Sequence, residues 1–176
     1  MTMHPTVAAR GDRKGHGGWL AALAVVAWLM APFPAAAAGP GAYTARQFDV
    51  RATVLDGGSL DVAETITFDF QSGTFQKVWR EIPRARTDGL EILEARMDGN
   101  PVTPGEGPGH IIVSSRNGRT RVEWRFAPAG PSAHTFELHY IARGVAYRDG
   151  ARDFVRWRLL PSEHSYKIGM SRATIV

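Results

Sequence analysis

One acidic residue breaks the alternating pattern around it and is the first candidate for chemistry. Glu64 stands between Val62 and Ile66, in a run where every second residue is apolar. A lone carboxylate among apolar side chains costs several kcal/mol of desolvation free energy, so Glu64 needs a partner. Arg80 is the best candidate because a guanidinium can bind both carboxylate oxygens at once. We therefore predict a buried structural ion pair between Glu64 and Arg80.

Two alternatives remain for Glu64. It could be a ligand-binding or catalytic carboxylate, or a β-bulge could turn it outward. With Asp69 or Glu81 it could form the pair of carboxylates that glycosidases use, which must face one cleft about 5–10 Å apart. Carboxylates are so frequent in a chain of this length that any two can be nominated. Because a pair of carboxylates is so unspecific a signal, we favour the structural ion pair between Glu64 and Arg80 over a catalytic role.

Three arginines form a second candidate site. Arg119, Arg121 and Arg125 share one face of an expected strand, interrupted only by Glu123. This stripe could face an anionic lipid or wall polymer, or it could be a solvated sheet face with ion pairs between strands. The core is expected to contain the large apolar side chains of the opposite face, Val122, Trp124 and Phe126, together with two further tryptophans, Trp79 and Trp157.

The sequence contains none of the common metal or nucleophile motifs in a convincing context. It has no cysteine, which excludes disulfides and thiolate metal sites. His134 and His139 are five residues apart, so they would lie on opposite faces of a strand, and no H-x-H or H-E-x-x-H spacing occurs. Gly169–Ala173 resembles a nucleophile elbow only loosely and is expected to be an ordinary turn. We predict neither a metal site nor a cofactor.

Short strands must position these residues. Phe48–Val54 and Leu60–Phe70 alternate apolar and polar residues, and Asp56–Gly58 between them has the chemistry of a hairpin turn. Asn117–Gly118 is typical of a second hairpin turn. Further strands are expected at Leu90–Met97, His110–Ser115, Arg121–Phe126, Thr135–Ala142, Asp153–Leu159 and Ser171–Val176. No segment beyond the first 38 residues keeps a helical period over ten residues without glycine or proline.

Seven or so short strands with glycine, proline and Asx turns predict an all-β fold. The expected architecture is an antiparallel β-sandwich of immunoglobulin-like type, without the immunoglobulin disulfide. Ser171–Val176 ends the chain while it is still apolar and β-branched, and an uncovered edge strand is an association hazard. This edge could add a strand from a partner. We also expect that the chain is truncated at its C-terminus.

The first 38 residues have the layout of a signal peptide. Three basic residues precede the apolar run Trp19–Met30, and Ala36–Ala38 provides the small residues of a cleavage site. The run is shorter than the roughly 20 apolar residues of a membrane-spanning helix. We predict a signal peptide at 1–38, a flexible leader at 39–45 and a sandwich domain at 46–176. An uncleaved N-terminal anchor is the alternative.

The charge of the exported part argues against a nucleic acid partner. The whole chain has a net charge of +4, and loss of residues 1–38 removes three basic residues and one acidic residue, which leaves +2. A nearly neutral exported domain has neither the charge nor the location of a nucleic-acid-binding protein. Whether the N-terminal segment is cleaved or kept as an anchor, the domain is expected in the periplasm or outside the cell.

The segment Phe48–Pro83 resembles a known family. Its Asp56-Gly57-Gly58-Ser59-Leu60 turn, Glu64 and the run Val78-Trp79-Arg80-Glu81-Ile82-Pro83 resemble the N-terminal domain of the YciQ-like predicted membrane proteins. Asp153 and Trp157 match a later part of the family pattern. The resemblance implies an all-β extracytoplasmic domain, followed in typical members by transmembrane helices. It implies no established reaction and therefore assigns no catalytic residue.

Taken with the composition, these features favour a non-enzymatic interaction or structural module of the cell envelope. Its expected partner is an envelope protein or polymer, and association with a membrane is left open. One alternative is an envelope glycan hydrolase that uses Glu64, Asp69 or Glu81. The other is an extracytoplasmic sensing domain of a membrane protein. Carboxylates on opposite sheet faces would argue against the hydrolase.

Overall fold

The computed structural model describes residues 41–162 and 164–176, and these residues form strands and no helix. The predicted signal peptide lies outside the described residues. The strands are β1 (Tyr43–Val54), β2 (Leu60–Phe70), β3 (Phe75–Pro83), β4 (Gly89–Met97), β5 (Asn100–Pro101), β6 (Thr103–Pro104), β7 (His110–Arg116), β8 (Arg119–Ala129), β9 (Ser132–Arg143), β10 (Ala146–Asp149), β11 (Arg152–Val155) and β12 (Ile168–Ile175).

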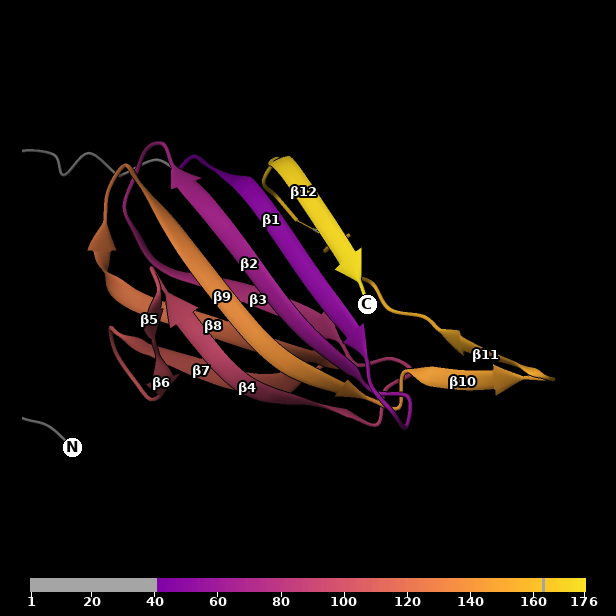
Figure 1. The fold of residues 1–176 in the computed structure, drawn as a ribbon. Coiled ribbons are helices and arrows are strands. Elements are labelled where there is room, and N and C mark those ends of the chain that lie inside the picture. The colour runs from indigo at the N-terminus through magenta and orange to yellow at the C-terminus, as the bar shows by residue number, and fades with distance from the viewer. Residues whose placement is uncertain (1–40, 163) are drawn as a thin grey trace, which may run out of the picture. The chain divides into compact units, whose positions relative to one another are not determined.

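Two sheets face each other across the core (Figure 1). The larger sheet has the strand order β12-β1-β2-β9-β4-β5, and the smaller sheet has the order β3-β8-β7-β6. β10 and β11 form a separate hairpin that projects beyond them. The prediction of an all-β sandwich is confirmed. Its sheets are mixed rather than purely antiparallel, because β12 pairs in parallel with β1 and β6 pairs in parallel with β7.

Local turn chemistry sets the two predicted hairpins. Gly57 and Gly58 have φ values of 83° and 79°, and Asn117 and Gly118 have values of 50° and 69°. These left-handed conformations suit glycine and asparagine and match the twist of the flanking strands. β1 pairs with β2 and β7 pairs with β8 directly across these turns, so both hairpin predictions are confirmed.

The core between the sheets is rich in aromatic side chains. Phe136 of β9 packs against Phe68 of β2 at a ring-centroid distance of 6.0 Å. It also contacts Trp124 and Phe126 of β8, at 5.7 and 5.8 Å. Tilted and edge-to-face contacts of this kind contribute beyond the apolar area that they bury. Phe136 therefore joins the two sheets.

The structure differs from the sequence prediction near both ends of the domain. β1 begins at Tyr43, and Ala45 is fully buried, so the flexible leader predicted for 39–45 does not extend to these residues. The strand predicted at Asp153–Leu159 is shorter, because β11 ends at Val155. Trp157 packs against the core from irregular chain beyond that strand.

β3 is a strand that the apolar pattern did not predict. Its inward positions are Val78, Arg80 and Ile82, and the guanidinium in the middle interrupts the apolar alternation. Trp79 lies on the other face and is 49% exposed, so its predicted place in the core is wrong. Its ring instead stacks on the guanidinium of Arg121, 4.3 Å from the ring centroid. Within residues 41–162 and 164–176, β3 pairs with β8 alone and forms one edge of the smaller sheet.

Candidate functional site

A buried ion pair links the two sheets. Arg80 of β3 donates hydrogen bonds from Nε and Nη2 to Oε2 and Oε1 of Glu64 in β2, at 2.6 and 3.0 Å. The hydroxyl of Tyr140 in β9 donates to Glu64 Oε1 at 2.9 Å. Glu64 is 1% exposed and Arg80 is 4% exposed. The structure thus places these two residues in a bidentate contact inside the sandwich, and Glu64 does not turn outward.

The remaining contacts of Arg80 complete this network. Its Nη1 donates to the main-chain oxygen of Glu81 at 2.6 Å, and its guanidinium lies 5.8 Å from the ring centroid of Phe48. Burial lowers the pKa of Arg80, but the charge and hydrogen bonds of Glu64 outweigh this effect and raise the pKa above its usual value. Burial, followed by the charge of Glu64, raises the pKa of Tyr140 well above its usual value. Near neutral pH, Arg80 is charged and Tyr140 is neutral.

Tyr140→Phe is expected to lower the free energy of unfolding at neutral pH by about 2 kcal/mol, because the hydroxyl donates to a buried carboxylate. Folding raises the Tyr140 pKa, so the stability that depends on the neutral phenol is present below the usual tyrosine pKa of about 10 and is lost as the pH rises above it. The deficit of the variant should therefore shrink above that pH. Urea unfolding at several pH values measures this difference in the free energy of unfolding between the variant and the wild type.

The control for this prediction is Tyr147→Phe, since Tyr147 is 43% exposed and has no place in the buried network. Tyr166, whose pKa is also raised by burial, is unchanged in both variants and contributes the same alkaline loss of stability. A Tyr140→Phe deficit that stays constant across the alkaline range would contradict the assignment.

A groove with a volume of about 770 Å³ runs beside β3. Residues 74–81 line one side of it, and Pro161 with His164–Tyr166 line another. Its aromatic lining residues are Tyr43, Phe68, Phe70, Phe75, Trp79, Phe126 and Tyr166. Arg80 also lines the groove, so the buried ion pair adjoins it. The sequence predicted the pair but not the groove.

The main chain of β3 faces away from β8 at alternate residues. The amide of Arg84 donates to the main-chain oxygen of Gly118, which fixes the even-numbered residues of β3 as those bonded to β8. In an antiparallel ladder, both polar main-chain groups of a residue point to the same neighbour. The odd-numbered residues Lys77, Trp79 and Glu81 therefore direct their main-chain groups to the free edge. The Arg80 guanidinium donates to the main-chain oxygen of Glu81, as expected for an oxygen that is not bonded to β8.

Both ends of the free edge of β3 carry features that limit its pairing with strands of other molecules. The register between β3 and β8 shifts between Phe75 and Lys77, and Pro83 ends the strand. Bulges, lysines and prolines commonly protect edge strands from aggregation. The open part of the edge is thus limited to residues 77–82.

The three arginines of the predicted stripe do share the outer face of the smaller sheet, where they contact acidic residues. Arg121 and Arg125 contact Glu123 at 3.0 and 3.1 Å. Arg119 and Arg121 each lie 3.9 Å from a carboxylate oxygen of Glu81. The stripe is therefore a sheet face on which arginines alternate with carboxylates, and much of its positive charge is compensated locally.

The carboxylates nominated for glycan hydrolysis do not face one cleft. Glu64 points between the sheets. Asp69 has the opposite parity on β2 and lies on the outer face of the larger sheet. Glu81 has the opposite parity to Arg80 and lies on the outer face of the smaller sheet. The structure does not bring these three residues together, so they do not form the paired arrangement of a glycosidase.

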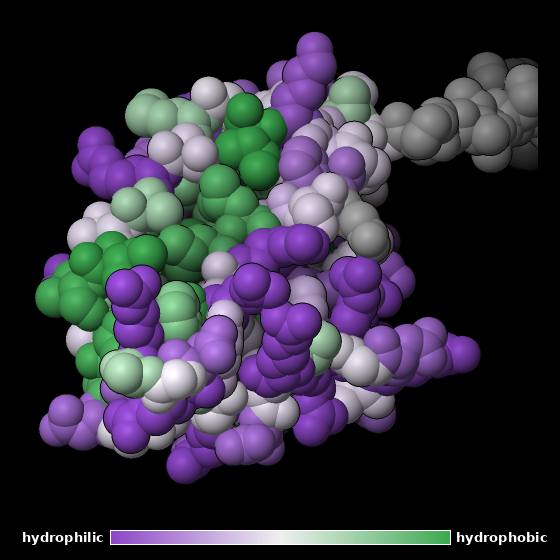
Figure 2. Space-filling model, turned by 90° about the vertical axis from the view of Figure 1, so that its right-hand side faces the viewer, coloured by the Kyte–Doolittle hydropathy of each residue, from purple (hydrophilic) through white to green (hydrophobic). Residues whose placement is uncertain are grey.

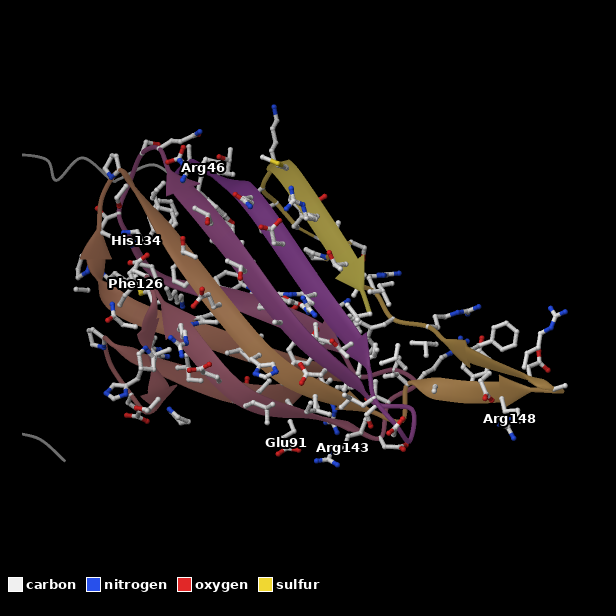
Figure 3. All side chains as sticks on the ribbon, viewed as in Figure 1. Arg46, Glu91, Phe126, His134, Arg143 and Arg148 are labelled. Carbon is white, nitrogen blue, oxygen red and sulfur yellow. The ribbon has the colours of Figure 1, made fainter. Side chains whose placement is uncertain are left out.

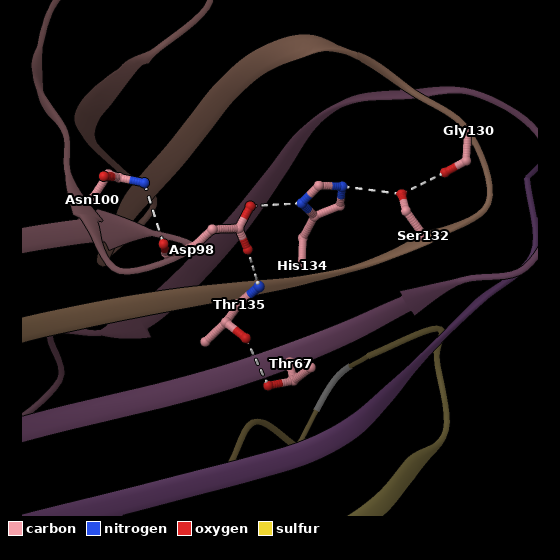
Figure 4. Close-up of polar contacts among 7 residues, drawn as sticks. All are labelled: Thr67, Asp98, Asn100, Gly130, Ser132, His134 and Thr135. Atoms are coloured by element: carbon pink, nitrogen blue, oxygen red, sulfur yellow. Dashed lines mark hydrogen bonds and ion pairs between the residues drawn. The ribbon is translucent and has the colours of Figure 1, made fainter.

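The structure shows a polar network beside the β4–β5 turn that the sequence did not predict (Figure 4). Nδ1 of His134 lies 2.7 Å from Oδ2 of Asp98, and its Nε2 lies 3.0 Å from the hydroxyl of Ser132. The main-chain amide of Thr135 donates to Oδ1 of Asp98 at 2.8 Å. This connectivity is that of a Ser–His–Asp triad. No local motif could reveal it, because Asp98 is 36 positions from His134 and meets it only when β4 pairs with β9.

The surroundings of Ser132 favour a structural role for this network. Its hydroxyl lies 2.8 Å from the main-chain oxygen of Gly130, so its single proton has a second acceptor besides His134. The His134 ring packs against Phe70 and Phe126, and Figure 3 shows His134 beside Phe126 at one end of the domain. Ser132 does not line the groove beside β3. The network fastens the start of β9 to the turn after β4.

The second histidine of β9 lies on the opposite face, as its spacing predicted. Nε2 of His139 lies 2.7 Å from Oδ1 of Asp61. Within residues 41–162 and 164–176, no group of three or more histidine, aspartate or glutamate side chains could hold a metal ion.

Comparison with known families establishes the relationship of this chain. A family model described as "Predicted membrane protein (DUF2207) N-terminal domain" matches residues 44–176. The chain belongs to this family. The match confirms the resemblance to the N-terminal domain of predicted membrane proteins, and the matched part of the DUF2207 domain includes the ion pair and nearly all of the groove. No helix in the described part of the chain is long and apolar enough to cross a membrane.

Solved structures resemble the DUF2207 domain only weakly. An M1 zinc metallopeptidase from Deinococcus radiodurans matches with a TM-score of 0.42 and 14% identity, over 60% of this chain and 21% of that one. Yeast LTA4 hydrolase matches with a TM-score of 0.43 and 11% identity, over 56% of this chain and 14% of that one. The match thus spans about a fifth or less of either enzyme, and we draw no functional conclusion from it. Comparison with curated proteins gave no match.

Proposed function

We propose that this DUF2207 domain is a non-enzymatic interaction module of the cell envelope, which binds an extended peptide segment of a partner protein as an added strand along β3. The observation that carries this proposal is the groove beside the free edge of β3. Strand addition gives affinity through main-chain hydrogen bonds and specificity through alternate side chains. The export of the domain is supported by the signal-peptide layout of residues 1–38.

The lining of the groove favours a segment that alternates apolar and acidic residues. Aromatic side chains such as Phe75 and Tyr166 offer contact area to the apolar residues of an added strand. Of the basic residues that line the groove, Arg125 already contacts Glu123 and Arg80 already pairs with Glu64, so Lys77 is the one that favours acidic side chains in the segment. The ion pair between Arg80 and Glu64 holds β3 in place against the larger sheet.

Trp79→Pro is expected to weaken peptide binding about tenfold or more, because it removes a main-chain donor from the free edge without touching the bonds to β8. The full chain is first used to select binders from a phage-displayed library of random nine-residue peptides. Fluorescence anisotropy of a labelled selected peptide then compares wild type, Trp79→Pro and Trp79→Ala. The alanine variant is the matched control, since it loses the same ring but keeps the amide.

Enrichment of alternating apolar and acidic peptides, with binding about tenfold or more weaker in Trp79→Pro than in Trp79→Ala, would support strand addition. Equal binding by the two variants, or no enrichment at all, would contradict it. Covalent labelling of Ser132 by a fluorophosphonate probe would contradict the non-enzymatic part of the proposal, because it would show an activated nucleophile in the network with His134 and Asp98.

A further inference from the structure

A cluster of exposed apolar side chains lies where the β1–β2 turn, the end of β12 and the β10–β11 hairpin meet. Each of its members is between 37% and 68% exposed. We name this cluster the apolar end; it consists of Val54, Leu55, Tyr147, Phe154, Val155, Ile175 and Val176. Figure 2 views the molecule from the side that carries β10, β11 and β12, and it shows hydrophobic side chains gathered there, bordered by hydrophilic ones.

Main-chain hydrogen bonds hold the three segments of the apolar end together. The amide of Val54 donates to the oxygen of Val176 at 2.9 Å. The oxygen of Gly58, in the β1–β2 turn, accepts from the amides of Val145 and Ala146 at 3.1 and 3.0 Å. These bonds place the three segments next to one another. Within the hairpin, Tyr147 and Phe154 pair on one face, and Val155, which pairs with Ala146, points to the other face.

The β10–β11 hairpin exposes an aromatic pair, and no third strand in the described part of the chain pairs with it. The rings of Tyr147 and Phe154 stack at a centroid distance of 5.6 Å. Arg148 and Asp153 form a bidentate ion pair at 2.8 and 3.1 Å, and Figure 3 shows Arg148 on the projecting hairpin. A two-stranded hairpin is marginally stable in water by itself. Exposed apolar groups in such a place indicate a contact surface.

The charge around the apolar end identifies the kind of surface that it fits. The chain from Ala146 to Arg158 has four arginines and two aspartates, a net charge of +2. Aromatic side chains favour the boundary between lipid headgroups and acyl chains, and nearby arginines are attracted to anionic headgroups. A second copy of the chain fits less well, because a symmetric contact would bring two positive surfaces together.

We infer that the apolar end lies against the surface of an anionic phospholipid bilayer, with the Tyr147–Phe154 pair at the level of the headgroups. This inference is independent of the groove beside β3, and neither depends on the other. Arginine stems and aromatic rings bury their apolar parts in such a position while their polar tips remain solvated.

The absence of cysteine from the sequence makes a site-specific test direct. Tyr147→Cys places a single thiol on the face of the aromatic pair, and Val113→Cys, in β7 of the smaller sheet, is the matched control because Tyr147 and Val113 are both 43% exposed. Each full chain is labelled with the environment-sensitive fluorophore NBD and mixed with vesicles of phosphatidylcholine alone or with phosphatidylglycerol added. Because the N-terminal segment is the same in both chains, its own membrane binding does not distinguish them.

The expected result is a gain of about twofold or more in NBD fluorescence at position 147 with anionic vesicles, a smaller gain with neutral vesicles and no gain at position 113. No gain at position 147, or an equal gain at both positions, would overturn the inference. An equal gain with both kinds of vesicle would overturn the anionic specificity. A gain without vesicles that rises with protein concentration would identify a second copy as the occupant and would also overturn it.

Discussion

Glu64→Gln is expected to lower the free energy of unfolding by about 3 kcal/mol. The substitution keeps the shape of the side chain but removes the negative charge that neutralises Arg80, which is 4% exposed. The guanidinium would remain buried without a counter-ion, and the amide cannot accept from both Nε and Nη2 as the carboxylate does. The urea midpoint should fall, with the slope of the transition unchanged.

Glu91→Gln is the matched control for this substitution. Glu91 also pairs with an arginine, Arg143, but both side chains are about half exposed, so the loss should be within about 1 kcal/mol. Replacement of both buried partners, with Glu64→Leu and Arg80→Met, should recover part of the lost stability because no charge is then left buried, although the Tyr140 hydroxyl loses its acceptor. An unchanged midpoint in Glu64→Gln would refute the structural assignment of the pair.

Phe136→Ala is expected to lower the free energy of unfolding by about 4 kcal/mol. Phe136 is 1% exposed and touches aromatic side chains of both sheets, so truncation leaves a cavity at the joint between them. The neighbours that would have to fill this cavity are rings fixed on paired strands, which limits relaxation. Thermal and urea unfolding measure the loss.

Leu93→Ala is the control for cavity formation, because Leu93 is 47% exposed and its truncation leaves no enclosed space. Its effect should remain within about 1 kcal/mol. A Phe136→Ala variant as stable as the Leu93→Ala variant would show that the two sheets are not joined through this aromatic contact.

The parts of the fold that sequence reasoning recovered depend on local patterns. Two-residue alternation in Leu60–Phe70 and Thr135–Ala142 predicted strands with one buried face, and both segments have it. Asn117–Gly118 predicted its turn because few residue pairs adopt left-handed conformations easily. Glu64 was conspicuous because a carboxylate at an inward position requires compensation, and this requirement pointed to an arginine.

The parts that were missed depend on contacts between distant segments. The open edge of β3 and the opposing residues near Tyr166 form a groove only after the sheets have packed, so no single stretch of sequence encodes it. Trp79 was misplaced because an aromatic side chain can stack on an arginine as well as enter a core. The parallel pairing of β12 with β1 joins strands from opposite ends of the domain, and their alternation does not specify direction.

The parallel pairing of β1 and β12 has a mechanical consequence. β1 begins at Tyr43 and β12 ends at Ile175, and the two strands run alongside each other in register from Ala45 with Ile168 to Ala52 with Ile175. Because they are parallel, tension between the start of β1 and the end of β12 acts along the strands and loads their shared hydrogen bonds in shear. The bonds would then have to break together instead of one after another, so we expect the domain to resist unfolding under tension in this direction.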